Sequence, residues 1–110
     1  MDKRPLGKTT LSVSRLSLGT MTFGAQADEA ASRSMLDLCL ERGINFIDTA
    51  NAYNAGKTEE ILGRLLAGRR DRAVLASKVF NKMGDGPDDR GLSRVCLCRA
   101  AYGERGAVAA

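Results

Sequence analysis

Three side chains that can hold or move a proton follow two short apolar runs of this chain. The run 44–47 ends on Asp48, and Tyr53 comes a few residues later. The run 73–77 ends on Lys78. In parallel α/β sheets, functional groups gather where the strands end, and neighbouring strands lie about 4.8 Å apart. The spacing therefore predicts that Asp48 pairs with Lys78, and that Tyr53 lies in the loop beside them.

An acid, a phenol and an amine at one edge of a sheet could donate a proton. A phenol with the usual pKa of about 10 is too weak an acid to be efficient at neutral pH. A neighbouring ammonium stabilises the phenolate, and a carboxylate holds the ammonium in place. Such a group could protonate a carbonyl oxygen while a hydride arrives at the carbonyl carbon. In the structural alternative, Asp48 caps a turn, Lys78 is solvated and Tyr53 only covers a loop.

A strand–helix–strand unit is predicted to place the carboxylate. Residues 15–18 form a short strand that leads into 19–21, and residues 28–42 form a helix that Gly43 stops. The run 44–47 is too short and too evenly apolar for an exposed strand, so it fits one buried in a parallel sheet. The helix residues that follow the 3.6-residue spacing, and so predict its packed face, are Ala31, Met35, Leu38, Cys39 and Arg42.

The pattern then repeats. Thr58 is predicted to cap a second helix that ends at Gly68. The first turn of this helix carries Glu59 and Glu60, which suit its positive end. Residues 72–77 form the next strand. The buried stripe of the second helix is predicted to be Ile61, Leu62, Leu65 and Leu66. The alternation of strands and helices, with short connections, predicts right-handed βαβ units and a parallel sheet.

The segments on either side of this unit are simpler. Residues 4–14 alternate loosely around Gly7, which predicts an amino-terminal β-hairpin. Residues 80–94 are rich in glycine and aspartate, as is typical of a loop, and Ser93 is predicted to cap a further helix.

Composition argues against several classes of protein. A chain of 110 residues with 44% apolar and 27% charged residues makes one small domain. Its net charge of +4 is scattered and its aromatics are few, so nucleic-acid binding is not expected. No apolar run approaches the roughly 20 residues of a membrane span, and no signal-peptide core is present. With three cysteines in no zinc-like spacing, we expect a cytoplasmic protein without a metal site or disulfide framework.

Five segments resemble the aldo-keto reductase family, in family order, over about residues 4–94. The most informative is 43–53, Gly-Ile-Asn-Phe-Ile-Asp-Thr-Ala-Asn-Ala-Tyr. The five are 19–24 (similar to the end of the first barrel strand), 43–53 (the second strand and its loop), 56–66 (a helix start), 70–79 (the third strand) and 86–94 (a loop of the branch of general-stress reductases and aryl-alcohol dehydrogenases).

The resemblance implies a fold and an activity. The chain would be the first three or so βα units of a (β/α)8 TIM barrel, α/β in class and incomplete, with an amino-terminal β-hairpin. The family reduces aldehydes and ketones reversibly with NADPH, less often NADH. Carried over by position, Tyr53 would be the general acid, Lys78 would stabilise its phenolate and Asp48 would pair with Lys78. The nicotinamide end of the cofactor site would be lined by Gly19, Thr20 and Met21, and Asp48 would also lie near the ribose.

Two features depart from the family. Its fourth catalytic residue is a histidine, and this chain has none. A whole barrel also needs at least about 200 residues. Residues 1–94 are therefore expected to be the amino-terminal part of a barrel and 95–110 a divergent tail, as a frameshift or truncated gene would leave. We expect the 110-residue chain to be marginally folded and weakly active or inactive. Two alternatives stay open: a non-catalytic subunit that binds a nicotinamide cofactor, and a decayed gene product.

Overall fold

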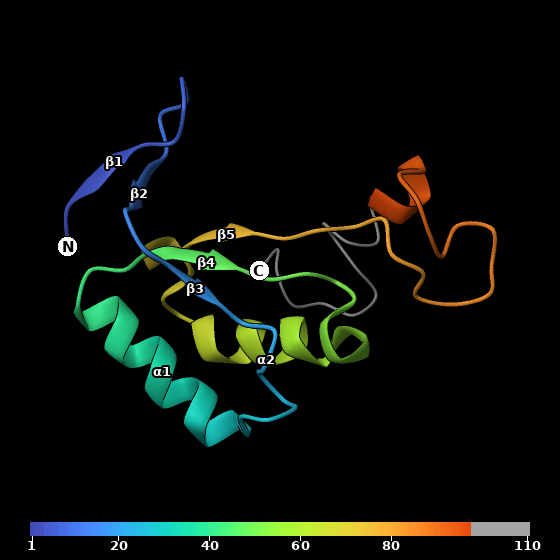
Figure 1. Ribbon diagram of the computed structural model, residues 1–110, viewed down its shortest axis with the longest axis horizontal. Coiled ribbons are helices and arrows are strands. Elements are labelled where there is room, and N and C mark those ends of the chain that lie inside the picture. The colour runs from blue at the N-terminus through green and yellow to red at the C-terminus, as the bar shows by residue number, and fades with distance from the viewer. Residues whose placement is uncertain (98–110) are drawn as a thin grey trace.

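The computed structural model describes residues 1–97, in which short parallel strands form a sheet with two α-helices on one side of it (Figure 1). The sheet strands are β3 (Ser17–Gly19), β4 (Phe46–Asp48) and β5 (Val74–Ala76). β4 lies in the middle, and both of its pairings are parallel. The α/β class and the parallel sheet predicted from the sequence are confirmed. Of the predicted tail, residues 98–110 lie outside the described part of the chain.

The helices connect these strands. The chain passes through α1 (Glu29–Glu41) between β3 and β4, and through α2 (Lys57–Leu66) between β4 and β5. Two 3₁₀ turns, η1 (Tyr53–Gly56) and η2 (Arg70–Arg72), stand on either side of α2. Within residues 1–97, no helix is both long enough and apolar enough to cross a bilayer.

The predicted amino-terminal hairpin is present, and it is fastened to the sheet where β4 begins. It pairs β1 (Lys3–Pro5) with β2 (Ser12–Ser14) in antiparallel register. The Ser14 N–H donates to Asn45 Oδ1 at 2.8 Å, and Ser14 Oγ accepts from the Asn45 N–H at 3.1 Å. Both residues are buried, so these bonds fix the start of β4.

The core lies between the sheet and the helices. Leu18, Ile47 and Leu75 are register partners across the three strands, so their side chains form one row on one face of the sheet. This row packs with the buried core cluster, in which all four predicted stripe residues of α2 are present. The cluster consists of Phe23, Leu36, Leu40, Ile47, Ile61, Leu62, Leu65, Leu66 and Ala73.

The packed face predicted for α1 is wrong. The residues that α1 buries are Ser32, Leu36 and Leu40. The residues predicted to pack, Ala31, Met35, Leu38, Cys39 and Arg42, are exposed or only partly buried. The helix has apolar residues on two faces, so the 3.6-residue spacing does not choose between them. Packing makes the choice, because Leu36 and Leu40 belong to the buried core cluster. An exposed two-bond ion pair of Arg64 with Glu29, whose shorter distance is 2.7 Å, adds a contact between α2 and α1.

The predicted cap of α2 is also wrong. The backbone of Asn54 and Ala55 has positive φ angles, 49° and 54°, and Gly56 follows at 93°. This left-handed turn, which favours glycine, starts the helix at Lys57, with Gly56 as its cap residue. The buried Thr58 hydroxyl instead donates to the Phe23 carbonyl at 2.9 Å, and so ties α2 to the segment after β3.

Other predicted boundaries are confirmed. Gly43 follows α1 with a φ of 77°, and Gly68 follows α2 with a φ of 74°. Both are left-handed positions that end a helix without a side-chain clash. Ser93 Oγ accepts from the Cys96 N–H at 3.1 Å, the bond expected of a helix cap.

Replacing Leu62 by alanine tests this core. Leu62 is fully buried, and removal of such a side chain costs about 2–5 kcal/mol of unfolding free energy. The same change at Leu38, which is 52% exposed, is expected to cost no more than about 0.5 kcal/mol. Urea unfolding of Leu62→Ala and Leu38→Ala, followed by far-ultraviolet circular dichroism, compares the two. Equal losses in both variants would contradict the packing described.

Candidate active site

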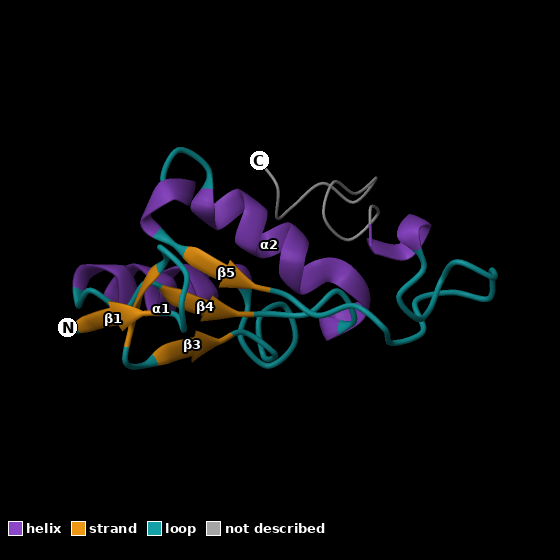
Figure 2. Ribbon diagram, turned by 90° about the horizontal axis from the view of Figure 1, so that it is seen from above, coloured by secondary structure: helices purple, strands orange, loops and turns teal. Residues whose placement is uncertain are grey.

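The three parallel strands end at the same edge of the sheet (Figure 2), and the predicted site residues stand at or just after these strand ends. Asp48 is the last residue of β4, and Lys78 follows the end of β5. Tyr53 is the first residue of η1, in the connection from β4 to α2. Because the strands run in the same direction, their carboxyl ends bring all three residues to one edge.

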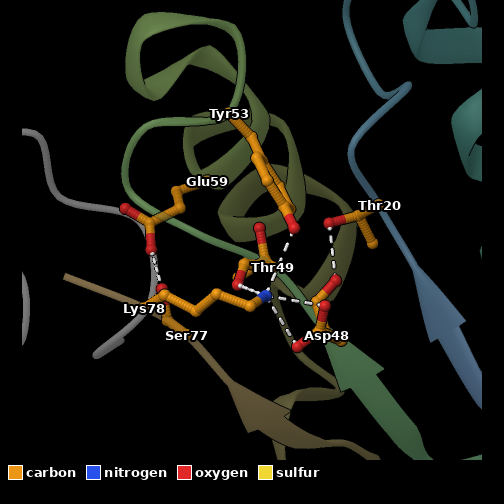
Figure 3. Close-up of polar contacts among 7 residues, drawn as sticks. All are labelled: Thr20, Asp48, Thr49, Tyr53, Glu59, Ser77 and Lys78. Carbon is orange, nitrogen blue, oxygen red and sulfur yellow. Dashed lines mark hydrogen bonds and ion pairs between the residues drawn. The ribbon is translucent and has the colours of Figure 1, made fainter. Parts of the chain in front are cut away.

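The Lys78 ammonium is the centre of the site (Figure 3). Its Nζ donates to both carboxylate oxygens of Asp48, Oδ1 at 2.8 Å and Oδ2 at 2.7 Å. Nζ also donates to the Thr49 carbonyl at 2.9 Å and to Tyr53 Oη at 3.2 Å. It lies 5.0 Å from the centre of the Tyr53 ring, within the range of a cation–π contact. The expected carboxylate–ammonium pair is present, and the phenol oxygen contacts the same ammonium.

These contacts raise the pKa of the Lys78 ammonium. The hydrogen bond to Asp48 is the largest cause, burial opposes it, and the hydrogen bond to Tyr53 raises the pKa further. The ammonium therefore stabilises the folded chain below the unfolded pKa of lysine, about 10.4, and this contribution is lost as the pH rises through the folded pKa. The Lys78 side chain is 51% exposed, so solvent weakens the ion pair.

Backbone hydrogen bonds hold the strand ends together around this pair. The Thr49 N–H donates to the Ala76 carbonyl at 2.8 Å, and the Asn51 N–H donates to the Lys78 carbonyl at 3.1 Å. The pairing of β4 with β5 thus continues beyond the strands as far as Lys78. The two ends cannot separate without breaking these bonds, which keeps the carboxylate and the ammonium in register.

The other predicted cofactor residues come from β3 and the segment after it, on the side of β4 away from β5. Gly19 is the register partner of Asp48 at the end of β3. The Thr20 side chain is fully buried, and its hydroxyl and N–H both donate to the Asp48 carbonyl, at 3.0 and 3.1 Å. Met21 is largely exposed. The structure therefore brings Gly19 and Thr20 beside the Asp48 backbone, while the role of all three residues in cofactor binding stays a prediction.

Two parts of the site were missed by sequence reasoning. One is the Thr49 carbonyl, since no residue type marks a backbone acceptor. The other is the carboxylate of Glu59, which accepts from Ser77 Oγ at 2.5 Å. Burial raises the pKa of Glu59, and the bond from Ser77 acts against that rise. The sequence feature that could have pointed to this contact is the position of Ser77, directly before Lys78 at the end of an apolar run.

The chain matches one protein family over most of its length. The sequence profile of the Aldo/keto reductase family matches residues 15–101. An uncharacterized oxidoreductase of Bacillus subtilis is 48% identical over 104 residues, which cover 84% of this chain and 32% of the relative. A relative from Arabidopsis thaliana, named "Probable voltage-gated potassium channel subunit beta", is 45% identical over 98 residues, 86% of this chain and 30% of the relative.

A solved structure agrees with these sequence matches. The aldo-keto reductase from Bacillus halodurans, in its holo form, superposes with a TM-score of 0.70 at 43% identity. The match covers 83% of this chain and 30% of that one. The chain thus spans about a third of the length of these relatives. The family match continues to residue 101, past the predicted boundary at 94, which stays a prediction.

Removing the charge of Asp48 tests the ion pair. In Asp48→Asn, the largest cause of the raised lysine pKa is lost, so the pKa of Lys78 is expected to fall. A nuclear magnetic resonance titration of carbon-13-labelled lysine, read at Cε, measures it. The matched control is Asp85→Asn, which breaks an exposed pair with Lys82 and leaves the pKa of Lys78 unchanged. An unaltered Lys78 titration in Asp48→Asn would show that the pair does not form in solution.

Proposed function

Because the chain belongs to the aldo-keto reductase family, we propose that its site donates a proton in the NAD(P)H-dependent reduction of aldehydes or ketones. Residues 1–94 would form the amino-terminal part of a (β/α)8 TIM barrel, with the site at the carboxyl ends of its strands. The observation that carries the proposal is the contact of one ammonium, that of Lys78, with both the Asp48 carboxylate and the Tyr53 phenol.

Tyr53 is the general acid in this proposal. When a hydride adds to the carbonyl carbon, negative charge develops on the carbonyl oxygen, and Tyr53 Oη gives its proton to that oxygen. The product is an alcohol, and the residue left behind is a phenolate. Lys78 Nζ, 3.2 Å from the phenol oxygen, stabilises this phenolate, and Asp48 keeps the ammonium charged and in place. Solvent then returns a proton to Tyr53.

The proposed place for the nicotinamide is the edge formed by Gly19, Thr20, Met21 and Asp48. When bound, a reduced nicotinamide supplies the hydride; NADPH is the proposed cofactor, and NADH is the alternative. The residues fit a flat ring, because apart from Gly19 and its two chain neighbours no residue has a heavy atom within 4 Å of where a Cβ of Gly19 would stand, and Met21 is largely exposed. The Thr20 hydroxyl is engaged with the Asp48 carbonyl, so we assign Thr20 to holding this edge together.

We expect weak or no turnover from the 110-residue chain alone. The 51% exposure of the Lys78 side chain lets water weaken the electrostatic interactions on which proton transfer depends. The chain also contains no histidine to orient the carbonyl group. The site therefore needs to be tested within a longer barrel.

A second candidate function is a non-catalytic subunit that binds a nicotinamide cofactor. The Arabidopsis thaliana relative favours it, since that protein carries the name of a potassium channel subunit. Such a subunit would bind cofactor without reducing a carbonyl. The contact of Tyr53 with Lys78 favours the reductase, because cofactor binding alone needs no proton donor.

A chimera tests the proposed acid. Residues 15–94 replace the matching segment of the Bacillus halodurans reductase, and carbonyl-dependent oxidation of NADPH or NADH is measured with a panel of aldehydes. Tyr53→Phe is expected to lower the rate by about 10²–10⁴-fold, the usual contribution of a general acid, while cofactor binding followed by fluorescence is kept. Full turnover by Tyr53→Phe would contradict the role of the phenol.

Two lysine variants complete this test. Lys78→Met is expected to lower the rate strongly, because the phenolate loses its cation. Lys82→Met makes the same change in an exposed pair with Asp85, and is expected to keep the rate. If the unmodified chimera binds the cofactor but no carbonyl compound of the panel causes the cofactor to be oxidised, the subunit function is favoured instead.

A further inference from the structure

A second polar contact is made by the residue that directly precedes Lys78 in the chain. Glu59 belongs to the first turn of α2, and its carboxylate accepts the hydrogen bond of Ser77 Oγ at 2.5 Å (Figure 3). Ser77 stands between the last residue of β5, Ala76, and Lys78. The contact therefore joins the start of a helix to the point where the chain leaves the sheet.

The main chain at Lys78 is held from two sides. On one side, its carbonyl accepts the Asn51 N–H at 3.1 Å, which ties it to the segment after β4. On the other side, the side chain of the preceding residue, Ser77, is tied to α2 through Glu59. Together these bonds hold the main chain from which the Lys78 side chain extends toward Asp48.

The helix start alone does not account for Glu59. A carboxylate in the first turn interacts favourably with the helix dipole, but Glu60 supplies the same charge in the same turn. Glu59 is partly buried, and burial of a carboxylate is unfavourable unless a hydrogen bond compensates for the lost water. The bond from Ser77 supplies this compensation, so the contact between the two side chains needs its own explanation.

We propose that Glu59 is a positioning residue: by holding the Ser77 hydroxyl, it fixes the end of β5 so that Lys78 Nζ stays within hydrogen-bond reach of Asp48 and Tyr53. The inference rests on the proposed function of Lys78 in proton transfer. A lysine side chain has four rotatable bonds and loses much entropy when it is held. If its backbone is released, the half-exposed ammonium turns toward water, and the phenol loses its cation.

The pKa of Lys78 reports whether this positioning occurs, and it is measured on the full 110-residue chain with carbon-13-labelled lysine. Glu59→Ala and Ser77→Ala are each expected to lower this pKa toward the value of a free lysine, about 10.4. Glu59→Gln keeps an oxygen that accepts from Ser77, and Ser77→Thr keeps the hydroxyl, so both are expected to retain the raised value. Glu60→Ala, which removes the same charge from the same helical turn, is the matched control and is expected to change nothing.

The pattern among these variants separates the alternatives. If Glu59 acts on the ammonium by its charge alone, Glu59→Gln lowers the pKa as much as Glu59→Ala, which would overturn the proposal. If the contact is merely structural, Glu59→Ala lowers the free energy of unfolding and leaves the pKa of Lys78 raised, which would also overturn it. Positioning through Ser77 predicts that Glu59→Ala combined with Ser77→Ala lowers the pKa no further than either change alone.

Two features keep this experiment decisive. Ser77 is exposed, so its variants are expected to fold even if Glu59→Ala does not. No cofactor or carbonyl compound is present, so a negative result rejects the positioning role without touching the reductase proposal. Conversely, a chimera that fails to reduce any aldehyde leaves the Lys78 titration in these variants unaffected.

Discussion

A lysine ammonium at the end of a sheet keeps one direction only when an anion is fixed opposite it. Here that anion is Asp48, which contacts Lys78 Nζ through both carboxylate oxygens. The pair exists because β4 and β5 are adjacent and parallel, so their carboxyl ends reach the same edge. The contact with Tyr53 depends on this pairing, because Asp48 holds the ammonium that the phenol oxygen contacts.

The remainder of the described chain holds that edge in place. The hairpin fixes one end of β4 through Ser14 and Asn45, and Thr20 fixes the other end through the Asp48 carbonyl. The apolar row of Leu18, Ile47 and Leu75 packs with the helices on one face, which frees the strand ends for polar side chains. Packing, backbone hydrogen bonds and the ion pair thus act at separate places along the same short strands.

The sequence predicted what local chemistry determines, and failed where packing decides. The order of strands and helices, the stops at Gly43 and Gly68, and the Asp48–Lys78 pair follow from runs of apolar residues and from residue type. The packed face of α1 does not, because both of its faces carry leucines and only the packing of Leu36 and Leu40 into the core cluster distinguishes them. The prediction that Thr58 caps α2 is wrong because the left-handed turn that ends at Gly56 depends on three consecutive φ angles, which residue types do not determine.

The phenol of Tyr53 and the carboxylate of Asp48 contact the same ammonium, and the proposed proton transfer depends on that contact. The measurement that tests this is the pKa of Lys78 in Tyr53→Phe, with Ser34→Ala, which removes an exposed hydroxyl of α1, as the control. Because the hydrogen bond to Tyr53 raises the pKa of Lys78, we expect a lower pKa of Lys78 in Tyr53→Phe and an unchanged one in Ser34→Ala. An unchanged pKa in both variants would contradict it, since the phenol would then be separate from the ion pair.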